Sequence, residues 1–156
     1  MNISKKFEPL ISGLSAGIVI ALLAFLTLEY SVGVWLLFSF GSSTLILFVF
    51  YKSEFAQPKN IFFGHLVSII IGISINELIG ISFISLGLSV GACVSVMMYF
   101  KIVHPPAAAN PLIALFADVS YDFILFPVIT GSIMMIILSF SINKLILKRQ
   151  YPKKWF

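Results

Sequence analysis

Six runs of apolar residues, separated by short polar stretches, make up most of the chain. They cover residues 10–29, 33–50, 61–80, 82–100, 105–117 and 122–143. A helix of about 20 apolar residues crosses the hydrocarbon core of a membrane, so the first, third, fourth and sixth runs predict long membrane-spanning helices. The second run is interrupted at 41–44 by Gly-Ser-Ser-Thr, and the fifth contains three prolines. These two runs predict short, broken helices.

The break before the fifth run carries a titratable ring followed by two prolines, at His104, Pro105 and Pro106. Proline lacks a backbone N–H, and the residue before it is pushed out of the α region, so an incoming helix cannot continue. Both prolines suit the first turn of a new helix, with Asn110 as a polar group just inside it. Pro58 starts the third run in the same way. We therefore predict structural or gating roles for His104, Pro105, Pro106, Gln57, Pro58 and Asn60.

The composition of the chain indicates a membrane protein whose main partner is lipid. Apolar residues are 60% of the 156, charged residues are 10%, and the mean hydropathy is +1.08, well beyond what a soluble domain needs. We expect one all-α membrane domain over residues 1–156. Lys5 and Lys6 ahead of the first run also fit a signal peptide, but no clean cleavage site follows, which favours a retained helix. A single cysteine excludes an internal disulfide.

The charges of the loops test how many runs cross. If all six do, the ten Lys and Arg residues fall on one side, and the other side receives Glu29, Glu77, Asp118 and Asp122. Basic residues in short loops stay in the cytoplasm, so we predict six crossings with both termini cytoplasmic, most simply in a prokaryotic inner membrane. The same residues account for the net charge of +4 without a nucleic-acid partner.

Two sets of three crossings invite a comparison of the two halves of the chain. Residues 44–48 align with 112–116, and Pro58 and Pro127 each introduce a long helix with an early glycine. We predict a 3+3 inverted repeat over 10–80 and 82–147, a design in which paired broken segments mark a binding site. The Gly-x-x-x-Gly pairs at 13/17 and 87/91 suit packing inside the bundle or dimerisation. We expect a homo-oligomer, with a dimer favoured.

The polar groups of the two broken runs are mostly hydrogen-bond donors, and no carboxylate lies at mid-membrane depth. A cation would require negatively charged oxygens, whereas a small anion requires donors and helix N-termini. The absence of a buried Lys or Arg argues against phosphate. We predict a site for a small inorganic anion near the midplane. Its substrate-binding residues are predicted to be Gly41, Ser42, Ser43, Thr44, His65 and Asn110.

The two histidines have alternative roles. His65 either contacts substrate or shuttles a proton, or else is a neutral ring that hydrogen-bonds a neighbouring helix, whereas His104 fits a capping ring at the Pro-Pro turn. Their spacing, with one apolar cysteine, lacks a metal-ligand pattern. No catalytic triad, phosphate loop or nucleotide motif is visible, so we expect no enzyme activity, catalytic residue, metal or cofactor.

Several blocks of the sequence resemble a known family. These are His104-Pro105-Pro106, Phe40-Gly41-Ser42-Ser43, Ala56-Gln57-Pro58-Lys59-Asn60 with Gly64-His65, and Tyr151-Pro152 with Trp155. In this order they resemble the HPP family of small integral membrane proteins. The chain departs from the family pattern at residues 108–111, Ala-Ala-Asn-Pro, where a Gly-Ala-Thr-type continuation is expected. The resemblance implies transport related to that of nitrite, with which members from chloroplasts and cyanobacteria are linked. The alternatives are a passive channel for a small neutral solute and a non-transporting membrane scaffold.

Overall fold

The computed structural model describes residues 6–29 and 33–155, and the described residues form helices and the segments that connect them, with no strand. Its main helices are α1 (Glu8–Glu29), α2 (Ser39–Val49), α3 (Pro58–Ile79), α4 (Phe83–Tyr99), α5 (Asn110–Phe116) and α6 (Thr130–Phe140). A short 3-10 turn, Glu54–Ala56, precedes α3, and another, Pro105–Ala109, leads into α5. Helical turns at Ile124–Ile129 and Ser141–Ile146 extend α6 at both ends. The six expected segments are therefore present.

Local sequence explains where several helices begin and end. α3 starts at Pro58 after an extended Gln57, and it ends at Gly80, whose φ of 66° suits a residue without a side chain. α4 starts with a capping box, in which the Ser82 hydroxyl accepts from the backbone N–H of Ser85 at 3.1 Å. The sixth segment changes direction at Phe126, which is extended just before Pro127. A proline thus stands near the start of α3 and of the sixth helical segment, which contains α6.

Three helical segments are long and apolar enough to cross a membrane: Glu8–Glu29, Pro58–Ile79 and Ile124–Ile146. α4 has 17 residues and is shorter than the long helix expected there. The second run is broken as predicted, because residues 33–37 are not helical and α2 has only 11 residues. The fifth run is likewise divided into a 3-10 turn and a seven-residue helix, α5.

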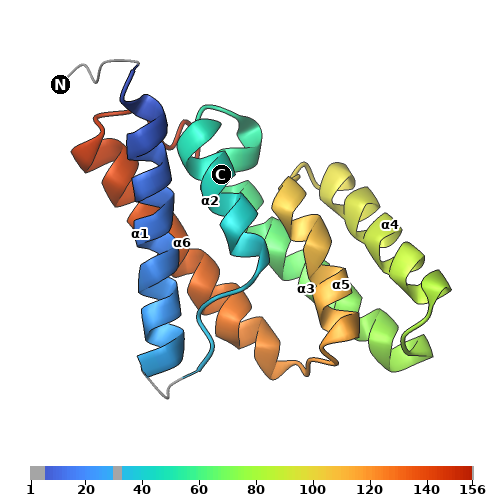
Figure 1. Ribbon diagram of the computed structural model, residues 1–156. Coiled ribbons are helices and arrows are strands. Elements are labelled where there is room, and N and C mark those ends of the chain that lie inside the picture. The colour runs from blue at the N-terminus through green and yellow to red at the C-terminus, as the bar shows by residue number, and fades with distance from the viewer. Residues whose placement is uncertain (1–5, 30–32, 156) are drawn as a thin grey trace.

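The first helix of each half of the chain packs on one helix of its own half and on one helix of the other half (Figure 1). α1 packs on α2 of its own half and on α6 of the other half. α4 likewise packs on α5 of its own half and on α3 of the other half. α3 also contacts α6, so the third helix of each half lies between the other elements. This is the pairing expected of two related three-helix units. The repeat boundaries at 10–80 and 82–147 stay a prediction.

Glycines allow the closest approaches between these helices. A Cβ on Gly64 would lie 2.9 Å from Cβ of His104, and one on Gly72 would lie 2.7 Å from Cα of Pro111. A Cβ on Gly131 would collide with the carbonyl oxygen of Trp35. Gly64 and Gly131, which the sequence alignment paired, therefore each face the segment that leads into a short helix. Gly13, Gly17, Gly87 and Gly91 face open space within the single chain.

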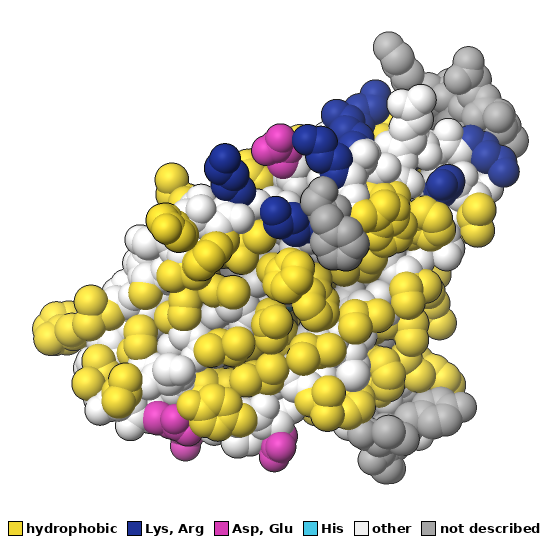
Figure 2. All heavy atoms as spheres, turned by 180° about the vertical axis from the view of Figure 1, so that it is seen from behind, with side chains coloured by type: hydrophobic (Ala, Val, Ile, Leu, Met, Phe, Trp, Pro, Cys, Tyr) yellow, Lys and Arg dark blue, Asp and Glu magenta, His cyan; other side chains and the backbone are white. Residues whose placement is uncertain are grey.

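Charge is distributed unevenly between two opposite ends of the molecule. Lys and Arg side chains gather at one end and a separate group of acidic side chains lies at the other (Figure 2). Glu8 at the start of α1 pairs with Arg149 near the C-terminus, with 3.2 Å between Oε1 and Nη2. Both ends of the described chain therefore lie at the same, basic end of the molecule, as an even number of crossings requires.

Candidate functional site

A cluster of polar side chains lies in the interior where the two broken segments meet α3. Its centre consists of Ser43 from α2, His65 and Ser68 from α3, His104 before α5, and Asn110 at the start of α5, and each is 0% exposed. Polar groups buried in an apolar interior are costly unless they are paired. All five are paired here, and they form one connected network.

Asn110 holds the two short helices and α3 together. Its Oδ1 accepts a hydrogen bond from the Ser39 hydroxyl at 2.7 Å. Its Nδ2 lies 3.2 Å from the backbone carbonyl of His65, 3.2 Å from Oγ of Ser68 and 3.0 Å from Nδ1 of His65. The first residues of α2 and α5 are thus joined directly, side chain to side chain.

Ser43 links the two histidine rings. Its Oγ lies 3.0 Å from Nε2 of His65 and 2.8 Å from Nε2 of His104. The same oxygen lies 3.1 Å from the carbonyl oxygen of Ser39, one turn earlier in α2. The rings are stacked edge to face with centroids 5.0 Å apart, and the ring of Phe40 covers His65 at the same distance.

The turn before α5 is fixed at three points, which sets the position of His104. Nδ1 of His104 donates to the carbonyl of Phe55 at 2.7 Å. The side-chain amide of Asn60 donates to the carbonyl of Val103 at 2.9 Å. Gly64 has no side chain, so the His104 side chain can approach α3 closely. The histidine ring is therefore held by the Glu54–Ala56 turn on one side and by Ser43 on the other.

The structure brings together three of the six predicted substrate-binding residues, Ser43, His65 and Asn110. Ser42 is exposed and donates to the Ser39 carbonyl at 2.8 Å. It lines an open cleft of about 590 Å³ between α2 and α5, together with Ser39 and apolar residues. This cleft borders the polar cluster, because Ser39 lines the cleft and donates a hydrogen bond to Asn110.

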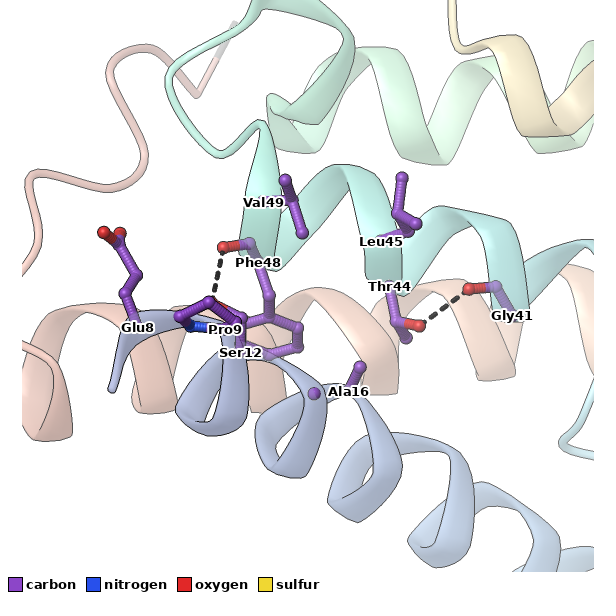
Figure 3. Close-up of a pocket in the computed structure, with 10 residues that line it drawn as sticks. Glu8, Pro9, Ser12, Ala16, Gly41, Thr44, Leu45, Phe48 and Val49 are labelled. Carbon is purple, nitrogen blue, oxygen red and sulfur yellow. Dashed lines mark hydrogen bonds between the residues drawn. The ribbon is translucent and has the colours of Figure 1, made fainter. Parts of the chain in front are cut away.

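Gly41 and Thr44 face elsewhere. They line a cleft of about 690 Å³ between α1 and α2 (Figure 3). The Thr44 hydroxyl donates to the carbonyl of Gly41 at 2.8 Å, and nearby the Ser12 hydroxyl donates to the carbonyl of Phe48 at 3.3 Å. Neither Gly41 nor Thr44 reaches the histidines in this arrangement.

The residues predicted to be structural occupy the turns around the cluster. Gln57 donates to the carbonyl of Ser53 at 2.7 Å and accepts from the backbone N–H of Lys153 at 2.8 Å, which ties the C-terminal segment to the start of α3. Pro58 is the first residue of α3, and Pro105 and Pro106 open the 3-10 turn before α5. The four residues therefore lie where the chain changes direction.

Ser68 and Thr27 are parts of the site's framework that the sequence reading missed. The Ser68 hydroxyl donates to the Gly64 carbonyl at 2.6 Å and completes the surroundings of Asn110. The Thr27 hydroxyl accepts from the backbone N–H groups of Trp35 and Leu36 at 2.9 and 3.0 Å, and so holds the extended segment before α2. Ser68 lies three residues after His65, on the same helix face, and that spacing was a usable signal.

The cluster contains no charged side chain. Over residues 6–29 and 33–155, no group of three His, Cys, Asp or Glu side chains is arranged to hold a metal ion. What the site offers is a set of neutral hydroxyl, amide and imidazole groups, each able to exchange one hydrogen-bond partner for another. Such groups suit the coordination of a small polar species or the passage of a proton.

The comparisons with known proteins agree with this architecture. The model of the HPP transmembrane region matches residues 2–152, which is nearly the whole chain. The chain belongs to the HPP transmembrane family. It is an integral membrane protein, and its own His-Pro-Pro stretch forms the turn that carries His104.

Two proteins of Dictyostelium discoideum, each described as a transmembrane protein, are similar to this HPP chain. One is 31% identical over 147 residues, covering 89% of the chain and 47% of the relative. The other is 30% identical over 126 residues, covering 76% of the chain and 44% of the relative. The chain thus spans about half the length of the curated relatives it matches. No solved structure matches it.

Proposed function

We propose that this HPP protein transports a small inorganic weak-acid anion across the membrane, with nitrite as the first candidate. The observation that carries the proposal is the buried network of Ser43, His65, His104 and Asn110, which lies where two broken helices meet. Paired interruptions of this kind mark the substrate site in transporters built from inverted repeats. The family resemblance, with its link to nitrite, points to the same class of substrate.

The chemistry of the network supports a small, singly charged species. Ser39, Ser43 and Asn110 offer hydroxyl and amide donors, and a hydrogen bond to a charged group contributes about 1.5–3 kcal/mol. A few such bonds would offset part of the cost of taking a monovalent anion out of water without holding it too tightly for release. A cation would find no carboxylate in the cluster, and a multivalent anion would find no Lys or Arg.

The cleft between α2 and α5 gives the proposed substrate a route to the network. Its volume of about 590 Å³ is ample for a three-atom anion with its remaining waters. Ser39 and Ser42 line this cleft, and the Ser39 hydroxyl donates to Asn110. In this proposal an anion first meets these two hydroxyls and then exchanges places with hydrogen bonds inside the network.

The proposal also includes an orientation in the membrane. The basic end, which carries the start of α1 and the C-terminal segment, faces the cytoplasm, because basic residues of short loops are retained there. Glu77 and Asp118, on the acidic end, then face the opposite side. Labelling of single cysteines introduced at Lys153 and Asp118 in intact cells, with Cys93 replaced by Ala, tests this. Reaction of the Asp118 site alone with an impermeant reagent is expected, and reaction of the Lys153 site alone would reverse the orientation.

Reconstitution tests the transport proposal. Purified protein in proteoliposomes is offered nitrite, nitrate, formate and chloride, with protein-free liposomes of the same lipid as the control. We expect saturable uptake of nitrite that exceeds the uptake of chloride. No uptake of any of the four by protein that is folded and correctly inserted would overturn the proposal.

The same assay separates the two alternatives named above. A passive channel would give flux that does not saturate and that extends to small neutral solutes such as urea. A scaffold would give no flux while the network still stabilised the fold. The hydrogen bonds within the network are compatible with a scaffold, so the decisive comparison is between stability and flux in the same variants.

A further inference from the structure

The hydrogen bonds around the two histidines fix where their protons lie. The carbonyl oxygen of Phe55 can only accept, so Nδ1 of His104 carries a proton. In the neutral ring, Nε2 of His104 is then a bare acceptor. It lies 2.8 Å from Oγ of Ser43, so the hydrogen bond must run from the Ser43 hydroxyl to His104.

His65 has the opposite arrangement. Asn110 presents its amide nitrogen to the carbonyl of His65, because that carbonyl can only accept, and its oxygen to the hydroxyl of Ser39. The amide nitrogen cannot accept a hydrogen bond, so Nδ1 of His65, 3.0 Å from it, is the unprotonated nitrogen, and the proton of the neutral ring lies on Nε2. Nε2 then donates to Ser43 at 3.0 Å. The result is a one-way chain from Asn110 through His65, Ser43 and His104 to Phe55.

From this chain we propose that Ser43, His65 and His104 form a binding site for one proton, and that the proton is carried together with the anion. The proposal rests on the proposed function and names its coupling ion. The proton-accepting atom is Nε2 of His104, because its partner is a hydroxyl that can give up a proton. The other unprotonated ring nitrogen, Nδ1 of His65, faces the amide of Asn110, which cannot.

Within the network, the transfer needs no movement of a heavy atom. A weak acid that has moved from the cleft into contact with the buried Ser43 loses its O–H proton and becomes the anion. Ser43 passes its own hydroxyl proton to Nε2 of His104, where a new N–H bond forms, and takes the acid's proton in its place. The new hydroxyl proton turns to the Ser39 carbonyl, which already lies 3.1 Å away. Ser43 then accepts from both histidines.

Charge balance couples the proton to the anion. Cys93, on α4, lies beside Ser68, which is itself a neighbour of Asn110. The other titratable or charged groups on the elements packed against the rings are Glu54, Lys59, Glu77, Tyr99 and Lys144, and in the described chain none of them hydrogen-bonds to either ring. A proton alone would place an unpaired cation in an apolar interior, and an anion alone would be equally unfavourable. The two together are neutral, so each raises the affinity for the other.

Solid-state ¹⁵N NMR of the reconstituted protein tests the proton positions directly, because the chain has two histidines. Without anion, we expect two neutral rings of opposite tautomer, one protonated at Nδ1 and one at Nε2. Saturating nitrite is expected to give one ring protonated at both nitrogens, assigned by the loss of its signal in His104→Asn. Two rings of the same tautomer without anion, or no doubly protonated ring with nitrite, would overturn the proposal.

Flux measurements provide the second test. With one bound proton per anion, the apparent affinity for nitrite rises about tenfold for each unit by which pH is lowered. Uptake acidifies the liposome interior and does not respond to an imposed membrane potential. In His104→Asn, the amide nitrogen of asparagine can still donate to Phe55 but Nε2 is absent, so this pH dependence is expected to be lost.

The outcomes also separate the two proposals. Nitrite uptake that carries current and moves no proton would overturn proton coupling and leave anion transport standing. Absence of any anion uptake would overturn the proposed function, and the NMR result would then decide the proton site on its own. Liposomes without protein, measured at the same pH values, correct for nitrous acid that crosses the lipid by itself.

Discussion

Two junctions of this protein share a backbone design and differ in chemistry. At the polar junction, α3 meets the turn before α5, and Gly64 allows the close approach of His104. At the apolar junction, α6 meets the segment before α2, and Gly131 allows the close approach of Trp35 and Phe40. In both cases a proline opens the long helix and an early glycine lies against the incoming chain. The design of the bundle therefore does not by itself require buried histidines.

Hydrogen bonding sharpens the difference between the two. At the polar junction, every member of the Ser43–His65–His104–Asn110 network has a partner. At the apolar junction, the position that follows the glycine is Ser132, whose hydroxyl donates only to the Ile129 carbonyl of its own helix at 3.1 Å. A buried polar network inside a membrane protein usually has a functional role. A buried polar network at one junction and not at the other fits a protein with one dedicated site.

Removing the centre of the polar junction is expected to have the largest effect on stability. Asn110→Leu keeps the approximate volume but leaves the Ser39 hydroxyl and the His65 carbonyl without their partner. Each buried polar group left unpaired costs about 1–3 kcal/mol, so we expect a loss of about 2–4 kcal/mol in the free energy of unfolding. Unfolding in mixed detergent micelles measures it. A loss below that of Ser132→Ala would mean that the network does not hold the two short helices.

Alanine substitutions of Gly64 and Gly131 test how closely the chain segments pack at the two junctions. The alanine Cβ in Gly131→Ala would collide with the backbone oxygen of Trp35, whereas in Gly64→Ala it would meet the His104 side chain at 2.9 Å. Overpacking costs about 1–3 kcal/mol, and we expect Gly131→Ala to lie at the upper end because backbone yields less than a side chain. Gly87→Ala, in open space on α4, is the control and should cost nothing. Equal losses at Gly87 and Gly131 would contradict the close approach.

The sequence was sufficient for much of this fold and for part of the site. The six apolar runs located the helices, and the Gly-Ser-Ser-Thr and His-Pro-Pro interruptions located the broken ones, because helix breaking is a local property of the chain. Ser43, His65 and Asn110 were named as one site and lie together. Gly41 and Thr44, on the same short helix as Ser43, lie against α1 instead. Which side of a short helix faces the site depends on the helices packed around it, and the local sequence does not determine that.

What the sequence could not give was the connection between distant residues. The carbonyl of Phe55, which fixes the proton of His104, belongs to the backbone and leaves no mark in the side-chain sequence. Thr27 holds the backbone of residues 35 and 36, a contact that depends on how α1 lies beside the extended segment. α4 covers residues 83–99 of its apolar run, because Ser82 caps its start and the chain turns at Lys101, whose φ is 54°.

A smaller effect is expected from the anchor beside His104. Asn60→Ala removes the half-buried bond to the Val103 carbonyl, 2.9 Å long, and an ordinary hydrogen bond is worth about 0.5–1.5 kcal/mol. We expect a loss of about 1 kcal/mol and weaker protection of residues 101–104 in hydrogen exchange. Unchanged exchange in this segment would show that Gly64 and Phe55 alone position the histidine.

The smallest effect belongs to the apolar junction. Ser132→Ala removes a hydroxyl that bonds only its own helix, so the unfolding free energy should change by less than about 0.5 kcal/mol. Thermal unfolding of the purified protein measures it. A large loss would mean that this junction also contains a polar network, and the contrast with the polar junction would disappear.

The most direct test of the account compares nitrite uptake by Ser43→Ala and Ser132→Ala in matched proteoliposomes. Both changes remove one buried serine hydroxyl, but only Ser43 touches the histidines. Loss of a bond that acts on a charged species corresponds to about a tenfold effect or more. The account predicts at least that loss of uptake in Ser43→Ala and wild-type uptake in Ser132→Ala, with both proteins folded. Wild-type uptake in Ser43→Ala would contradict it.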